Sequence, residues 1–161
     1  MRLRSVLILL VLVFLAVSSN AQEYNGPPPE KADMVYLLHA EDLIETEQAE
    51  ARQEDRKNKT AYVLPGASSP ARTPMAEPIF IIRSEKIQPQ DLQLYSMDIE
   101  KGNREVVFPK KLGKQGPRPR YLTFKRVEDD VYWVEANEWL ENGQYCITPK
   151  GANEVFCFEV Y

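Results

Sequence analysis

Two cysteines near the end of the chain are the residue pair best placed to do chemistry. Cys146 and Cys157 are the only cysteines among 161 residues, and each lies in a run of largely apolar residues. If Gly151 and Ala152 form a two-residue hairpin loop, the residues that face each other on the two strands have numbers that add up to 303. This register sets Cys146 directly opposite Cys157. Opposed residues of antiparallel strands are close enough for a disulfide. We therefore predict a Cys146–Cys157 disulfide, with two unbonded cysteines packed as small hydrophobic residues as the alternative.

Motifs for other chemistry are missing from the sequence. It contains no glycine-rich phosphate loop, no paired-histidine metal motif and no serine or cysteine nucleophile motif. His39 is the single histidine and lies between Leu38 and Ala40, so we expect a partly buried structural residue. The carboxylate pairs Glu41-Asp42 and Asp129-Asp130 are typical of solvated turns. Two cysteines and one histidine are too few for a zinc site, so we expect no metal, no cofactor and no enzymatic activity.

Positive charge is concentrated in residues 109–120. The cations of this basic loop lie among glycines and prolines, with no acidic residue between them: Lys110, Lys111, Lys114, Arg118 and Arg120. They make the loop a candidate site for a polyanion or an acidic partner. The alternative is a solvated loop whose charges keep edge strands from pairing. Residues 41–55 have the opposite character, with seven carboxylates against one arginine, and the two segments can meet within one molecule or between neighbours.

Aromatic residues are dense in the C-terminal third of the chain. Strand alternation over residues 131–136 places Tyr132 and Val134 inward and Trp133 outward. We therefore predict an exposed Trp133 and treat it as a candidate binding residue. The alternative is that these aromatics build the core, as they do in many β-sandwiches.

The first 21 residues predict where the protein works. Arg2 and Arg4 precede an apolar run over residues 6–17, and Ser19-Asn20-Ala21 supplies the small residues that a signal peptidase requires. Twelve apolar residues are too few to cross a bilayer core of about 30 Å. We predict a cleaved signal peptide over residues 1–21, a secreted or periplasmic location, and no stable membrane insertion after cleavage.

The mature chain has the size and charge of one acidic domain. Cleavage after Ala21 leaves 140 residues and removes Arg2 and Arg4, so 18 basic residues face 24 acidic ones and the formal charge is −6. That length matches a single domain, here residues 34–161. The charge gives no general attraction to nucleic acid, and we expect no nucleic-acid partner.

Composition divides the rest of the chain into segments. Residues 22–33 contain three consecutive prolines and predict a flexible Pro-rich tether. The composition of residues 41–57 favours a helix. Their alternation instead favours a polar edge strand that turns at 55–59 and returns over 60–64. We favour the strand because the downstream pattern is β. Residues 65–78 hold four prolines and predict a long surface crossing. Residues 79–83 predict a central strand, and residues 84–91 a bend or single helical turn.

Three hairpins follow from the pattern of apolar runs and turns. A loop at Gly102-Asn103 sets Ile99 against Val106 and Met97 against Phe108 on a core face, with Glu100 opposite Glu105. A loop over residues 128–130 sets Leu122 against Ala136 and Phe124 against Val134, with Lys125 beside Trp133. The loop at Gly151-Ala152 sets Gly143 against Val160, Tyr145 against Phe158 and Ile147 against Phe156.

The last hairpin carries a resemblance to a known class of domain. The segment Leu140-Glu141-Asn142-Gly143-Gln144-Tyr145, followed by residues 151–158, resembles the final hairpin of exported bacterial β-sandwich domains of immunoglobulin-like type. The resemblance covers about the last 80 residues and rests on strand and turn pattern alone. It implies an all-β, immunoglobulin-like antiparallel β-sandwich and carries over no functional residue.

Two hypotheses for function follow. The first is an exported, non-enzymatic domain that binds a protein or cell-envelope partner, by strand addition or through the basic loop. The second is a carbohydrate or polyanion binding module that uses the basic loop and Trp133.

Overall fold

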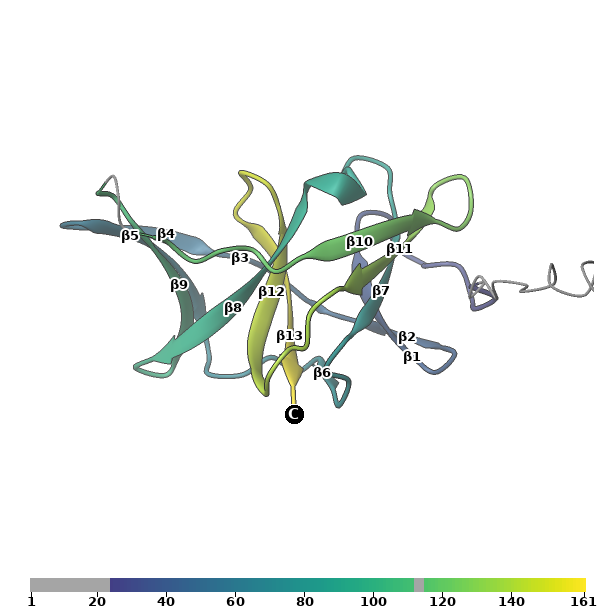
Figure 1. Ribbon diagram of the computed structural model, residues 1–161, viewed down its shortest axis with the longest axis horizontal. Coiled ribbons are helices and arrows are strands. Elements are labelled where there is room, and N and C mark those ends of the chain that lie inside the picture. Colours follow the sequence, from purple (N-terminus) through teal and green to yellow (C-terminus); the bar gives the residue numbers. More distant parts are fainter. Residues whose placement is uncertain (1–23, 112–114) are drawn as a thin grey trace, which may run out of the picture.

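The chain folds into two β-sheets, and no α-helix occurs among the residues that the structure describes. The computed structural model describes residues 24–111 and 115–161 (Figure 1). Its one helical element is a 3-10 turn, η1 (Pro89–Asp91), within the segment predicted as a bend or helical turn. The all-β class is therefore confirmed, and the predicted signal peptide of residues 1–21 lies outside the described residues.

The smaller sheet has five antiparallel strands with an apolar strand at its centre. In spatial order they are β10 (Leu122–Arg126), β11 (Val131–Ala136), β7 (Ile79–Arg83), β1 (Val35–His39) and β2 (Asp42–Glu45). β7 pairs with β11 on one side and β1 on the other, which confirms its predicted central position. Its residues Phe80, Ile81 and Ile82 are fully buried because both faces of the sheet are covered.

The larger sheet has eight strands and lies on the other side of the molecule (Figure 1). Seven of them follow the spatial order β3 (Glu47–Glu50), β13 (Glu154–Val160), β12 (Gly143–Pro149), β8 (Leu92–Glu100), β9 (Asn103–Pro109), β5 (Lys59–Pro65) and β4 (Arg52–Arg56). The eighth, β6 (Arg72–Thr73), pairs in parallel with the end of β13.

The larger sheet closes into a ring because its two edge strands are consecutive in the chain. β3 pairs with β13, β4 pairs with β5, and only Ala51 separates β3 from β4. One bent strand, residues 47–56, therefore forms both edges. With this strand counted once, six strands make the ring: the bent strand, β5, β9, β8, β12 and β13. In Figure 1, β3 and β4 follow one path at the upper left, and β8 and β9 form the wall below them.

Two main apolar cores follow from this arrangement. The first lies between the five-stranded sheet and the outer face of β8, β12 and β13, and includes Phe80 and Ile147. The second lies inside the ring and includes Leu64 and Val106. A third, smaller cluster around Trp133 covers the other face of the five-stranded sheet.

Two of the three predicted hairpins have the predicted register. In the β10–β11 hairpin Leu122 lies opposite Ala136, and in the β12–β13 hairpin Tyr145 lies opposite Phe158. Residues 41–57 are strands, and β4 turns at its end and returns as β5, so the strand alternative is correct. A helix here would have left the backbone groups of β13 and β5 without partners.

The first hairpin differs from its prediction by two positions. Asp98 lies opposite Glu105 and Ile99 opposite Arg104, so the loop is Lys101-Gly102 and not Gly102-Asn103. Both loop residues have positive φ, 51° and 79°, which is the conformation of a type I′ turn. Ile99, predicted to be core, is 58% exposed and lies two residues before the turn, at the end of the hairpin.

Residues 65–78 cross from the ring to the five-stranded sheet, and most of the crossing is exposed, as predicted, but some of its side chains are buried. Ser69, Ala71 and Thr73 are buried, and Glu159 donates its backbone N–H to the carbonyl of Ala71 at 2.8 Å. The prolines of this segment exclude a long ladder, and the two-residue strand β6 fits between Pro70 and Pro74.

Residues 24–33, predicted as a flexible tether, lie against the five-stranded sheet. The guanidinium of Arg83 donates to the carbonyl oxygens of Pro29 and Glu30, at 3.0 and 3.1 Å. One carboxylate oxygen of Asp33 accepts the backbone N–H groups of residues 85–87, each at 2.9 Å. An extended proline-rich segment forms no backbone–backbone hydrogen bonds of its own, and Arg83 supplies partners for two of its carbonyl groups.

The sheet order does not reproduce the expected immunoglobulin-like arrangement. That fold packs two open sheets face to face, whereas here the larger sheet bends back on itself through Ala51. The resemblance of the last hairpin is local, because the β12–β13 register is compatible with either a flat or a closed sheet.

Candidate functional site

The inward-facing side chains of the ring form successive layers along its axis. Alternation along each strand places every second residue inside, and the pairing register aligns these residues across neighbouring strands. One end holds Arg104 and Glu47, and the middle holds the cysteine pair. Aromatic residues of β5, β8 and β9 line the other end.

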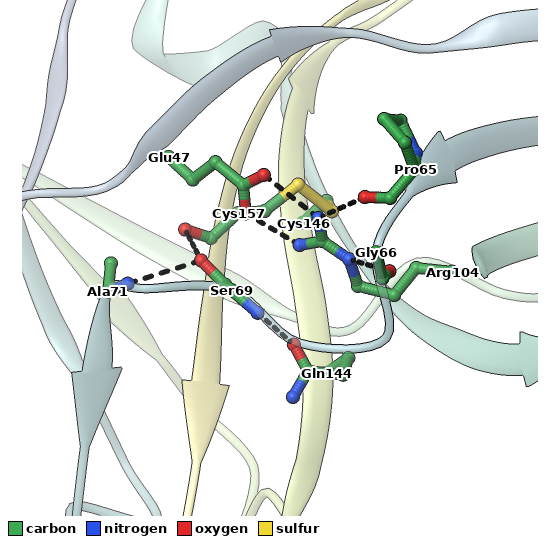
Figure 2. A network of polar contacts seen from close by, with 9 residues as sticks. All are labelled: Glu47, Pro65, Gly66, Ser69, Ala71, Arg104, Gln144, Cys146 and Cys157. Carbon is green, nitrogen blue, oxygen red and sulfur yellow. Dashed lines mark hydrogen bonds and ion pairs between the residues drawn. A yellow bond between two sulfur atoms is a disulfide. The ribbon is translucent and has the colours of Figure 1, made fainter. Parts of the chain in front are cut away.

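Arg104 and Glu47 close the first end of the ring (Figure 2). Arg104 is 1% exposed, and its Nη1 and Nη2 donate to the two carboxylate oxygens of Glu47 at 2.6 and 2.8 Å. Its Nε donates to the carbonyl of Gly66 and its Nη2 to that of Pro65, both at 3.0 Å. A guanidinium removed from water needs such a set of partners. The two parallel hydrogen bonds also fix the orientation of the guanidinium relative to the carboxylate, in addition to their charge attraction.

Ser69 connects the same end of the ring to β12 and β13 (Figure 2). Its backbone N–H donates to Oε1 of Gln144 at 2.9 Å, and its hydroxyl donates to the carbonyl of Cys157 at 3.1 Å. The hydroxyl also accepts the backbone N–H of Ala71 at 3.3 Å. Residues 65–71 therefore act as a plug over this end.

Glu47 remains ionised in this position. Burial raises the pKa of Glu47, but the hydrogen bonds and positive charge of Arg104 lower it, and the pKa stays below its usual range. A group of this kind does not exchange protons near neutral pH. The closed end is therefore a structural element and not an acid–base site.

The two cysteines cross the middle of the ring wall. Cys146 lies directly opposite Cys157, as the predicted register requires, and their Sγ atoms are 2.01 Å apart, the distance of a disulfide bond. Both residues are almost completely buried. The bond ties β12 to β13 next to the Arg104–Glu47 pair.

The opposite end of the ring is open, and we call this cavity of about 150 Å³ the ring mouth. Tyr62, Tyr95 and Phe108 form its aromatic walls. The ring of Phe108 packs edge-on against Tyr62 at a centroid distance of 5.8 Å and against Tyr95 at 5.7 Å. The side chains of Gln93 and Asn153 add polar groups to its lining.

The lining of the ring mouth suits an uncharged apolar group. None of the described residues that line it carries a charge. Burial raises the pKa of Tyr95, so its hydroxyl stays neutral and lies 3.4 Å from Oε1 of Gln93. Concave, mostly apolar sites with a few polar groups are the usual form of small-ligand sites, and the mouths of β-barrels are a common place for them.

The cations of the basic loop do not form one free cluster. Lys110 forms an ion pair with Asp55 at 2.8 Å, and Arg120 pairs with Glu138 at 3.1 Å. The first pair joins the basic loop to the acidic segment 41–55 within one molecule. Lys111 and Arg118 are exposed, and Lys114 lies outside the described residues.

Trp133 is buried, contrary to the prediction. Alternation does direct it away from the main core, but on that face Tyr24 and Leu38 pack against the cluster that contains Trp133, and Trp133 is 8% exposed. The sequence could not show this cover, because Tyr24 lies in a segment without strand pattern. The exposed aromatics of this region are Tyr121 and Trp139 instead.

Other candidate groups are isolated at the surface. His39 is exposed at the end of β1, where its backbone lies opposite that of Asp42 in β2. The expected burial of His39 is therefore wrong. The pairs Glu41-Asp42 and Asp129-Asp130 are exposed, as expected of turns. Within residues 24–111 and 115–161, no group of three or more potential metal ligands occurs, and no helix has the length and apolar character to cross a membrane.

Arg104 and the ring mouth are the features that sequence reasoning missed. Arg104 shares a strand face with Val106 and Phe108, the face predicted to be core. A charged residue at a core position signals a buried partner, and this signal was present in the sequence. The ring mouth had no comparable signal, since its walls come from strands far apart in the chain.

Comparison with known proteins identifies no relative. No family model, no curated protein and no solved structure matches this chain.

Proposed function

We propose that this chain is an exported, non-enzymatic binding protein whose site is the ring mouth. The mouth holds an apolar group that a protein or cell-envelope partner presents. The ring supplies a rigid frame for this site, because the disulfide and the Arg104–Glu47 pair fix its walls.

The observation that carries the proposal is the composition of the cavity. Its volume is about 150 Å³, its walls are the rings of Tyr62, Tyr95 and Phe108, and its lining carries no charge. A cavity of roughly this size accepts a benzene-sized group. The amides of Gln93 and Asn153 are available to a polar atom on the occupant, which would orient it.

Export is part of the proposal. The charged and apolar segments of residues 1–21 support a signal peptide, and a buried disulfide is compatible with an oxidising compartment. The immunoglobulin-like resemblance is not part of it, since the ring supplies the site.

Binding of a polyanion by the basic loop is the second candidate, and it has less support. Ion pairs with Asp55 and Glu138 already engage Lys110 and Arg120. The charge left to attract a polyanion is therefore smaller than the sequence implies.

The proposal is tested by titrating the mature protein with benzene and following backbone amide resonances. We expect saturable shifts at Ala51, Gly151 and Asn153, which surround the ring mouth. Ala152 is exposed and lines the mouth, so Ala152→Trp should block it and abolish these shifts.

Ala67→Trp is the matched control. It makes the same change at an exposed alanine in the plug at the closed end, and it should leave the titration unchanged. The proposal fails if the wild-type protein shows no saturable shift around the mouth, or if Ala152→Trp binds as the wild type does.

A further inference from the structure

Two aromatic side chains project into solvent at one end of the five-stranded sheet. Tyr121 is 76% exposed and Trp139 is 74% exposed. Tyrosine and tryptophan bury most of their surface in ordinary folded proteins. The exposure of these two therefore needs an explanation separate from the ring mouth, whose lining includes neither residue.

Hydrogen bonds at or next to each aromatic residue hold the two segments in place. Asn137 donates its backbone N–H to the carbonyl of Tyr121 at 2.9 Å, and the backbone N–H of Tyr121 donates to Glu138 Oε1 at 2.9 Å. Leu140, which follows Trp139, donates its backbone N–H to the carbonyl of Ala76 at 2.8 Å. The rings are thus presented by a fixed backbone.

The backbones of the two aromatic residues lie close together. Tyr121 lies beside Asn137, and Trp139 is two residues further along the chain. With about 3.8 Å between consecutive Cα atoms and about 5 Å between paired strands, the two Cα atoms lie within roughly 13 Å. That span matches a few sugar units in a chain.

The surroundings of the rings are polar, which favours a glycan over an apolar protein surface. Arg120 pairs with Glu138 at 3.1 Å, and the hydroxyl of Thr123 donates to Oδ1 of Asn137 at 3.3 Å. The core of a protein interface is normally apolar, with polar groups at its rim. A sugar instead packs its C–H face on an aromatic ring while its hydroxyl groups need polar partners like these.

We propose that Tyr121 and Trp139 form a stacking platform for a polysaccharide, and that Arg118 makes the platform favour an acidic one. Arg118 is exposed and lies three residues before Tyr121 in the chain, and its guanidinium is suited to binding a carboxylate in bidentate form. This glycan site is distinct from the ring mouth and does not depend on it.

Tryptophan fluorescence tests the proposal directly, because the other tryptophan is buried. Trp133 is 8% exposed, so acrylamide quenches chiefly Trp139. Oligogalacturonate, an acidic probe, should shift the emission to the blue and protect Trp139 from acrylamide at low salt. Chitin oligosaccharides, a neutral probe, should bind more weakly.

Substitutions assign the binding to individual side chains, with affinity measured by calorimetry. Trp139→Ala and Tyr121→Ala should each lower the affinity for oligogalacturonate about tenfold, because each removes one of the two aromatic faces. Arg118→Gln should lower the affinity for oligogalacturonate and not for the chitin oligomer. Tyr161→Ala removes another exposed aromatic residue, 51% exposed, and should change neither affinity.

Three results would exclude the platform, and a fourth would overturn the role of Arg118. The platform is excluded if neither oligosaccharide binds, or if Trp139→Ala retains full affinity. It is also excluded if sedimentation shows a dimer that Trp139→Ala dissociates while no oligosaccharide binds, because the rings would then contact a second copy. Equal affinity for both probes would overturn the role of Arg118.

Discussion

Arg104 and Glu47 join opposite walls of the ring. Arg104 belongs to β9 and Glu47 to β3, 57 residues earlier, and two hydrogen bonds of 2.6 and 2.8 Å connect them. β3 is the first half of the bent strand that closes the sheet. The ion pair therefore holds the closing strand where the ring needs it.

Removing either partner of this pair should destabilise the protein more than removing both. Glu47→Leu leaves a buried guanidinium without its carboxylate, and the usual cost of such a change is about 3–5 kcal/mol. The double variant Arg104→Met with Glu47→Leu removes both charges and should cost less than Glu47→Leu alone. Urea denaturation of the two single variants and the double variant measures this. Costs that simply add would show that the two side chains act independently.

The pair also predicts a dependence on acid. The pKa of Glu47 is lower in the folded protein than its usual value of 4.5, because burial raises it while the hydrogen bonds and positive charge of Arg104 lower it, with a net lowering. The stability that this carboxylate contributes is therefore present above pH 4.5 and is lost as the pH falls through the folded-state pKa.

The difference in unfolding free energy between wild type and Glu47→Gln should accordingly be largest at neutral pH and shrink below pH 4.5. Denaturant titrations at several pH values measure it. A difference that stays constant down to pH 3 would contradict the assignment of this acid dependence to Glu47.

Local pattern was sufficient to predict the hairpins at the C-terminal end. In β12 and β13 the alternation of apolar residues, the turn at Gly151 and the cysteine pair all require the same register, and that register is observed. The β8–β9 hairpin had no such agreement, because Gly102 permits either of two neighbouring loops. The positive φ of Lys101 shows which loop the chain adopts.

Ring closure could not be predicted from local pattern. It depends on the bend at Ala51, where the chain leaves β13 and joins β5, and alternation is the same on both sides of that residue. The burial of Trp133 likewise depends on Tyr24, more than one hundred residues earlier. Both features are set by contacts between segments far apart in sequence.

The disulfide should be present in the mature protein and should stabilise it measurably. Cys146 and Cys157 are separated by 11 positions, and closing a loop of that length contributes about 3 kcal/mol through the entropy of the unfolded chain. Denaturant unfolding of wild type and the Cys146→Ala, Cys157→Ala double variant measures this contribution. The mass of unreduced protein should be two hydrogen atoms below that of the reduced form, and detection of two free thiols would contradict the bond.

Phe156 should be among the residues most sensitive to truncation. Its side chain is fully buried in the core between the two sheets, and Phe156→Ala leaves a cavity there at a cost of about 3–5 kcal/mol. Lys150 lies at the exposed turn of the same hairpin, so Lys150→Ala should cost under about 0.5 kcal/mol. Thermal and urea unfolding of both variants compare an inward position with an outward one in a single hairpin. If the two substitutions cost the same, Phe156 does not fill the space between the ring and the five-stranded sheet.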